Sequence, residues 1–186
     1  MATWSDFAAD APRLAEAIRA LLEQYGPGLG YLATVRADGG PRVHPVSPVI
    51  SDEGLFCFVI DSPKRRDLER DGRYALHSFP PEHSDDEAYV AGRARPVTDP
   101  ARIHRLASNL RAAPQVDWRL FEFHIDVAML ARHGHAAATP LSADSAGRAS
   151  VQVWLDPAGG TPDRARPARA ARPRHRRPVA EPVNGV

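Results

Sequence analysis

Cysteine and long apolar runs are nearly absent from this chain. Cys57 is the only cysteine in 186 residues, which excludes an intramolecular disulfide and a cysteine-based zinc site and favours a reducing compartment. The N-terminal stretch MATWSDFAAD has no basic segment followed by an apolar core, and no run approaches the ~18 apolar residues of a membrane span. We therefore expect a cytoplasmic protein with no membrane partner.

A strong net charge is also missing. The formal charge is +1 at pH 7, so the overall field does not favour nucleic acid as a partner. Lysine is almost absent. Lys64 is the single lysine among 24 basic residues, and all the others are arginines. The one ammonium side chain of an arginine-rich protein makes position 64 a candidate functional position.

Apolar residues become scarce towards the C-terminus. Residues 155–186 are mainly proline, alanine and arginine, and from residue 156 onward the segment has seven arginines and three acidic residues, which is a net charge of +4. So little apolar surface cannot offset the entropy lost on ordering the chain. We predict one domain over residues 1–154 and a disordered tail over residues 155–186, through which only weak binding of nucleic acid is expected.

The sequence of residues 1–154 is typical of an antiparallel β protein. Apolar residues that alternate or run together predict six strands, and short turns such as ADGG and SDEG join neighbouring strands as hairpins. We therefore expect a mainly β (α+β) fold that closes as a small antiparallel barrel with flanking helices. The predicted strands cover residues 29–36, 42–50, 55–60, 73–79, 88–97 and 120–131, and the predicted helices cover residues 10–25, 62–71 and 100–112.

Two prolines interrupt the second predicted strand. Pro45 and Pro48 lie within it, and proline cannot donate a hydrogen bond to a neighbouring strand. This strand must therefore be an edge, be bulged, or meet something other than a strand, such as a ligand. Arg42 and His44 lie on one face of it, because side chains on a strand alternate with a period of two.

The turn after the third predicted strand has the pattern of an anion site. Ser62 occupies the N-cap position of a short helix, and Pro63 occupies its first helical position. The backbone N–H groups at such a terminus carry partial positive charge, and Lys64, Arg65 and Arg66 add full charges. The alternative is that these charges only form the solvated face of the helix.

Three stretches carry a resemblance to a known family. They are YLATVRADGGPRVHPVSPVI, LFCFVIDSPKRRDLERDGRYALHSF and YVAGRARPV, and in this order and spacing they resemble the pyridoxamine 5'-phosphate oxidase-like family from about Leu14 to Ala131. The resemblance implies a six-stranded antiparallel split β-barrel (FMN-binding split barrel), a homodimer with the flavin between two barrels, and FMN as the cofactor. In that family a turn of the form S-x-K-x-x-(N/D)-L binds the flavin phosphate.

The resemblance also implies contacts for individual residues. Ser62 and Lys64 match the phosphate ligands of the turn, Arg42 matches a basic residue that reaches the same phosphate, and Arg65 is compatible with the motif. Backbone groups of the second strand would meet the flavin ring, and the end of the third strand would form the opposite wall. The ring contacts implied are Val43, His44, Pro45, Val46 and Ser47 on the first side and Phe58, Val59, Ile60 and Asp61 on the second.

The implied activity is that of a flavin-dependent oxidoreductase with a small-molecule substrate. Similar proteins use the deazaflavin F420 or bind haem, and a non-catalytic flavin-binding or interaction protein is a further alternative. The oxidase proper holds pyridoxal phosphate with a C-terminal segment that contains arginine and tryptophan, and this chain has no match for that segment. We assign no catalytic residue, and no metal, because His124, His133 and His135 lack a typical ligand spacing.

Overall fold

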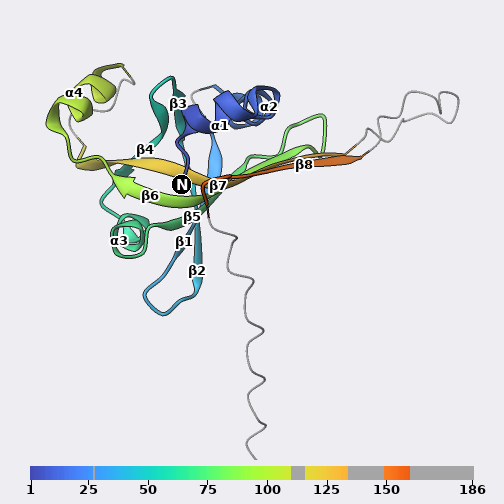
Figure 1. The fold of residues 1–186 in the computed structure, drawn as a ribbon. Coiled ribbons are helices and arrows are strands. Elements are labelled where there is room, and N and C mark those ends of the chain that lie inside the picture. The colour runs from blue at the N-terminus through green and yellow to red at the C-terminus, as the bar shows by residue number, and fades with distance from the viewer. Residues whose placement is uncertain (27, 110–115, 134–148, 160–186) are drawn as a thin grey trace, which may run out of the picture.

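The computed structural model describes residues 1–26, 28–109, 116–133 and 149–159. Within these segments the chain forms helices and antiparallel strands that alternate along the sequence (Figure 1). The helices are α1 (Trp4–Asp10), α2 (Pro12–Glu23), α3 (Pro63–Arg70) and α4 (Pro100–Asn109). The strands are β1 (Gly30–Val35), β2 (Pro41–Val46), β3 (Val49–Ser51), β4 (Gly54–Ile60), β5 (Arg73–Ser78), β6 (Glu87–Pro96), β7 (Trp118–Arg132) and β8 (Ser150–Leu155).

The strands form one antiparallel sheet that curls into a half-barrel. Its order is β2-β1-β5-β6-β7-β4-β3, and β8 pairs with β7 outside this path. Strands β2 and β3, which follow each other in the chain, therefore lie at opposite ends of the path. This arrangement confirms the predicted split barrel with flanking helices, but the sheet of the described residues has eight strands, so the predicted number of six was wrong.

One of the two additional strands arises where the predicted strand 42–50 divides in two. β2 pairs with β1 and β3 pairs with β4, and Pro48 lies between them without a backbone donor. Because β2 has β1 as its one partner among the described strands, it is an edge strand. Of the three alternatives given for this strand, an edge, a bulge or contact with something other than a strand, the sheet order shows the edge. The prediction of one continuous strand was wrong.

The other two elements that were not predicted, α1 and β8, lie near the two ends of the described chain and pack against each other. Thr3 begins α1 with a capping box, in which its hydroxyl accepts a hydrogen bond from the Asp6 N–H at 3.1 Å. In β8, the Trp154 ring lies 4.9 Å from the Phe7 ring, and its indole N–H donates to Asp10 Oδ2 at 2.6 Å. These contacts tie β8 to the N-terminal helix.

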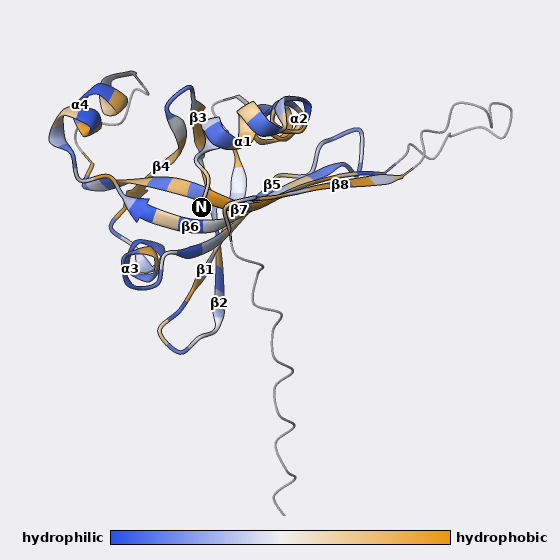
Figure 2. Cartoon of the chain, in the orientation of Figure 1, coloured by the Kyte–Doolittle hydropathy of each residue, from blue (hydrophilic) through white to orange (hydrophobic). Residues whose placement is uncertain are grey.

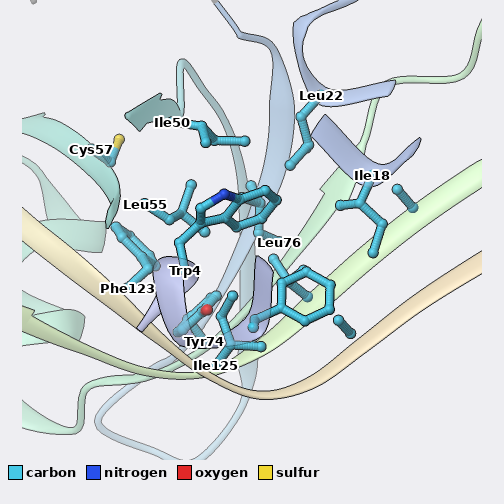
Figure 3. Packing of buried hydrophobic residues seen from close by; sticks show 14 of the residues in the cluster. Trp4, Ile18, Leu22, Ile50, Leu55, Cys57, Tyr74, Leu76, Phe123 and Ile125 are labelled. Atoms are coloured by element: carbon cyan, nitrogen blue, oxygen red, sulfur yellow. The ribbon is translucent and has the colours of Figure 1, made fainter. Parts of the chain in front are cut away.

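The main core lies between α1, α2 and one face of the sheet (Figure 1). Leu14, Ile18 and Leu22 recur every four residues along α2, so they share one helix face, and all three are buried. Figure 3 shows Trp4 of α1 surrounded by core side chains that several strands contribute. A second cluster, formed by Phe56, Val97, Leu106 and Leu120, packs beneath α4.

Helix α3 differs from the other helices in being almost entirely polar (Figure 2). Leu68 is its one buried apolar residue, and it anchors the helix to the main core. In Figure 1, α3 lies on the side of the sheet away from α1 and α2, near the hairpin of β1 and β2. The charged residues of α3 are therefore held at one rim of the half-barrel.

Packed structure continues beyond residue 154. Asp156 is only 6 % exposed, and its N–H donates to the Asp126 carbonyl at 2.9 Å. Residues 160–186 of the predicted tail lie outside the described residues, so disorder there stays a prediction. No helix in the described segments is both long enough and apolar enough to cross a membrane.

Candidate functional site

The candidate site lies where the end of β4, the start of α3 and the edge strand β2 come together. Ser62 has an extended backbone and Pro63 is the first helical residue, as predicted. The Ser62 hydroxyl does not cap the helix, because it donates instead to the Ile60 carbonyl at 2.9 Å. Cys57 Sγ lies 3.8 Å from the Ser47 carbonyl oxygen, which brings β4 beside the end of β2.

Lys64 is half-buried at the first turn of α3. Among the described residues, its ammonium group has no hydrogen bond or ion pair. Its charge acts on two neighbours, since it lowers the pKa of both His44 and Cys57. Burial has the larger effect on Cys57 and raises the pKa of its thiol to about 12, so this cysteine stays protonated and unreactive.

His44 contributes a buried nitrogen without a partner. Its side chain is partly covered, and Nε2 is fully buried with no hydrogen bond among the described residues. Burial lowers the pKa of the imidazole most, Lys64 and Arg42 lower it further, and Asp67 opposes them. His44 is therefore neutral at pH 7.

Arg42 is fixed in place by a buried carboxylate on α3. Asp67 is 4 % exposed, and its Oδ2 accepts hydrogen bonds from Arg42 Nε at 2.7 Å and from the Thr34 hydroxyl at 3.0 Å. Arg70 donates to the other carboxylate oxygen at 3.3 Å. Burial alone would raise the pKa of Asp67, but these hydrogen bonds outweigh it and the pKa lies below its usual value. Asp67 and Thr34 were not identified as site residues from the sequence, although Asp67 occupies the N/D position of the phosphate-binding motif.

A cationic groove opens between α3 and the β1–β2 hairpin. It has a volume of about 470 Å³, its lining includes Asp38 and Asp67, and four arginines line it as well. These are Arg36, Arg42, Arg66 and Arg70, of which Arg36 and Arg66 also pair with Asp38 and Asp61. The rim at α3 thus carries an excess of positive charge.

The remaining predicted residues fall into exposed and buried sets. Val43, Pro45 and Ser47 on the edge strand side are exposed, as are Ile60 and Asp61 on the other side, whereas Val46 and Val59 are buried and Phe58 is partly buried. Arg65 bonds to Glu69 and Asp117, so its charge is already neutralised.

A metal centre has no support in the described segments, which hold no group of three histidine, cysteine or acidic side chains that could bind an ion. His135, one of the three histidines considered from the sequence, lies outside these segments.

Solved structures of other proteins share this fold. A structure titled HupZ from Group A Streptococcus has 18 % identity and a TM-score of 0.52, over 61 % of this chain and 90 % of that one. A "heme binding protein" from Mycobacterium smegmatis has 16 % identity and a TM-score of 0.52, over 75 % of this chain and 57 % of that one. These likenesses establish the fold alone, and no curated protein matches.

The family comparison covers more than half of the chain. The sequence model described as "Pyridoxamine 5'-phosphate oxidase" matches residues 14–130, a range that includes β1 to β6, α3 and nearly all of β7. It therefore contains the edge strand, the end of β4 and the polar helix that form the candidate site. The chain belongs to the pyridoxamine 5'-phosphate oxidase family.

Proposed function

We propose that this protein is a homodimeric FMN-binding oxidoreductase that acts on a small-molecule substrate. The observation that carries the proposal is Lys64, whose ammonium group is unpaired among the described residues and stands in the first turn of α3. In a chain with one lysine and 23 arginines, all four arginines of the nearby groove have carboxylate partners. A phosphate group would supply the partner that Lys64 lacks.

The other groups at the site suit the same ligand. Arg42 is held towards α3 by Asp67, and the helix N-terminus adds the partial positive charge of its N–H groups. The buried nitrogen of His44 offers a further polar contact. When bound, FMN would supply the electron or hydride transfer chemistry, while the protein positions its ring.

The flavin ring would lie along the free edge of β2. This edge has no neighbouring strand among the described residues, so its backbone groups from Val43 to Ser47 are open to a ligand. The residues from Phe58 to Asp61, at the end of β4, would form the opposite wall. The Cys57–Ser47 contact supports this placement, because it keeps the two walls together.

The outer face of the sheet supports the homodimer. Side chains that face each other across β2, β1, β5, β6, β7 and β8 form two adjacent, mainly apolar rows. These rows are exposed on β2 and β8 and mostly half-buried on the strands between them, and a mainly apolar surface of this extent is the kind that a second copy of the chain would cover. One row is Val43, Ala33, Ala75, Ala91, Val127 and Leu155, and the other is Pro45, Tyr31, His77, Tyr89, Met129 and Val153.

Flavin binding is tested by comparing FMN with riboflavin, which lacks the phosphate. A charge-assisted contact contributes roughly 1.5–3 kcal/mol, so Lys64→Ala should weaken FMN about ten-fold to a hundred-fold and leave riboflavin unchanged. Fluorescence quenching measures both affinities. Arg19→Ala on α2, which removes an ion pair with Glu23, is the matched control. Equal affinity of the unaltered protein for FMN and riboflavin would contradict the proposal.

Haem binding is the second candidate, and F420 remains an alternative cofactor. The neutral, unpartnered Nε2 of His44 is the type of nitrogen that can bind haem iron, and one protein of the same fold carries haem binding in its title. F420 would use the same phosphate contacts as FMN. The absorption spectrum of the purified protein distinguishes a flavin band, a deazaflavin band and a Soret band.

A further inference from the structure

His44 faces the interior side of β2, together with Arg42. Across the β1–β2 pair, Arg42 lies opposite Thr34 and His44 lies opposite Leu32, and both of these β1 residues are almost fully buried. Nε2 of His44 is buried on this side and lacks any hydrogen-bond partner among the described residues. Burying a polar atom without a hydrogen bond destabilises a folded protein, which is a reason to look for a ligand that binds it.

The charges around His44 are predominantly positive. Lys64 from α3 and Arg42 from β2 act on it as cations, and Asp67 from α3 is the one carboxylate that acts in the opposite sense. That carboxylate is already occupied by three donors. The Cys57 thiol of β4 adds no charge, because its pKa is about 12. Among the described residues, the one carboxylate that acts on His44 therefore already has its hydrogen-bond donors elsewhere.

We propose that His44 is the third ligand of the cofactor phosphate, beside Lys64 and Arg42, and that it takes up one proton from solvent when the phosphate dianion binds. This inference rests on the proposed function, because it needs a phosphate at Lys64. It adds a residue and a proton to that site. The step is a simple protonation: the neutral imidazole gains a proton and then donates Nε2–H to a phosphate oxygen.

Two effects of the bound dianion act in the same direction. Its negative charges offset Lys64 and Arg42, which otherwise disfavour the imidazolium form, and its oxygen provides the hydrogen-bond acceptor that Nε2 lacks. Both effects raise the pKa of His44 from the lowered position that it has without ligand. A group with a higher pKa in the bound state strengthens binding at low pH and loses that contribution as pH rises through the bound-state pKa.

Calorimetric titration of the full chain with FMN measures this proton directly. Titrations at about pH 7.5, where the phosphate monoester is already a dianion because its second pKa is about 6, are run in two buffers of different ionisation enthalpy. The difference in observed heat gives the number of protons taken up. We expect close to one proton per FMN and none per riboflavin, and FMN affinity that falls up to ten-fold per pH unit above neutrality.

Variants identify the group that takes up the proton. His44→Asn and His44→Gln should still bind FMN but without proton uptake and with a flatter pH dependence. His104→Asn, which changes an exposed histidine of α4, should behave like the unaltered protein. Circular dichroism establishes that each variant is folded.

The outcomes separate this inference from the proposed function. FMN binding without proton uptake, or proton uptake that persists in both His44 variants, overturns the role of His44 and leaves the FMN site standing. Absence of any preference for FMN over riboflavin overturns both. If neither variant folds, the unaltered protein decides, because equal proton uptake with FMN and riboflavin contradicts the inference.

Discussion

Arg42 Nε donates a hydrogen bond to Asp67 Oδ2 across 2.7 Å, and this contact joins the edge strand β2 to helix α3. Replacing Asp67 by asparagine removes the charge that holds Arg42 and Arg70 in place. Removing one partner of a buried ion pair costs roughly 3 kcal/mol, so Asp67→Asn should lower the free energy of unfolding by about that amount. Urea denaturation measures the change, and an unchanged midpoint would show that Arg42 is held by other contacts.

The same pair predicts how stability depends on pH. The hydrogen bonds to Asp67 outweigh its burial and lower its pKa in the folded protein, so its contribution is fully present above the ordinary carboxyl pKa of about 3.9. That contribution is lost as pH falls through the lowered folded-state pKa. The stability difference between the unaltered protein and Asp67→Asn should therefore be constant near neutrality and shrink in acid.

The two rows on the outer face of the sheet predict a mutation that would separate the proposed dimer. Val43 is 59 % exposed on β2, and a carboxylate placed there would be buried without a partner if a second copy covers it. Val43→Glu should therefore yield a monomer in light scattering at micromolar concentration, while the unaltered protein is a dimer. Val116→Glu, at an exposed position outside the two rows, is the control and should remain dimeric.

Tyr74 predicts a substitution that stabilises the protein. Its side chain lies in the main core (Figure 3), and its hydroxyl is buried without a hydrogen bond among the described residues. Tyr74→Phe removes a polar group whose burial is not compensated, so the free energy of unfolding should rise by about 1 kcal/mol. Tyr25→Phe is the contrasting variant, because the Tyr25 hydroxyl donates to the Pro80 carbonyl at 2.7 Å. A loss of stability in Tyr74→Phe would mean that the hydroxyl has an ordered partner.

Because Asp156 is packed against the domain, two deletions with different end points test where the predicted tail begins. Deleting residues 160–186 should leave the melting temperature and FMN affinity unchanged, because that segment offers little apolar surface. Deleting residues 156–186 also removes the hydrogen bond from Asp156 N–H to the Asp126 carbonyl, so this shorter chain should melt at a lower temperature. A drop of several degrees for the first deletion would show that the tail contributes to the folded domain.

Local sequence patterns were sufficient for much of the fold, but not for partners that are distant in the chain. The apolar run of β4 and the Ser62-Pro63 start of α3 were predicted from neighbouring residues alone. The division at Pro48 was missed because apolar residues continue past the proline to Val49 and Ile50, and only the pairing with different neighbours separates β2 from β3. The alternation in β8 was overlooked beside a polar C-terminal segment.

The candidate site shows the same limit. Lys64 and Arg42 were identified from a local motif and from a resemblance. Asp67 was treated only as one of the charges that offset the basic residues of α3, because its role depends on Thr34 and Arg42, which lie 33 and 25 residues away in the chain. No pattern of neighbouring residues predicts that Thr34 and Arg42 both form hydrogen bonds with Asp67.

The position of β7 between β6 and β4 in the sheet has a consequence for how the chain folds. Phe56 of β4 pairs with Glu122 of β7, and Ala2 forms backbone hydrogen bonds with Ile125 of the same strand. Neither contact can form before β7, which follows β4 by more than 50 residues, has been synthesised. Folding with such distant pairings is slow compared with folding through local hairpins. Until the ribosome has released Glu122, the apolar strand β4 presents an open edge that can pair with other chains.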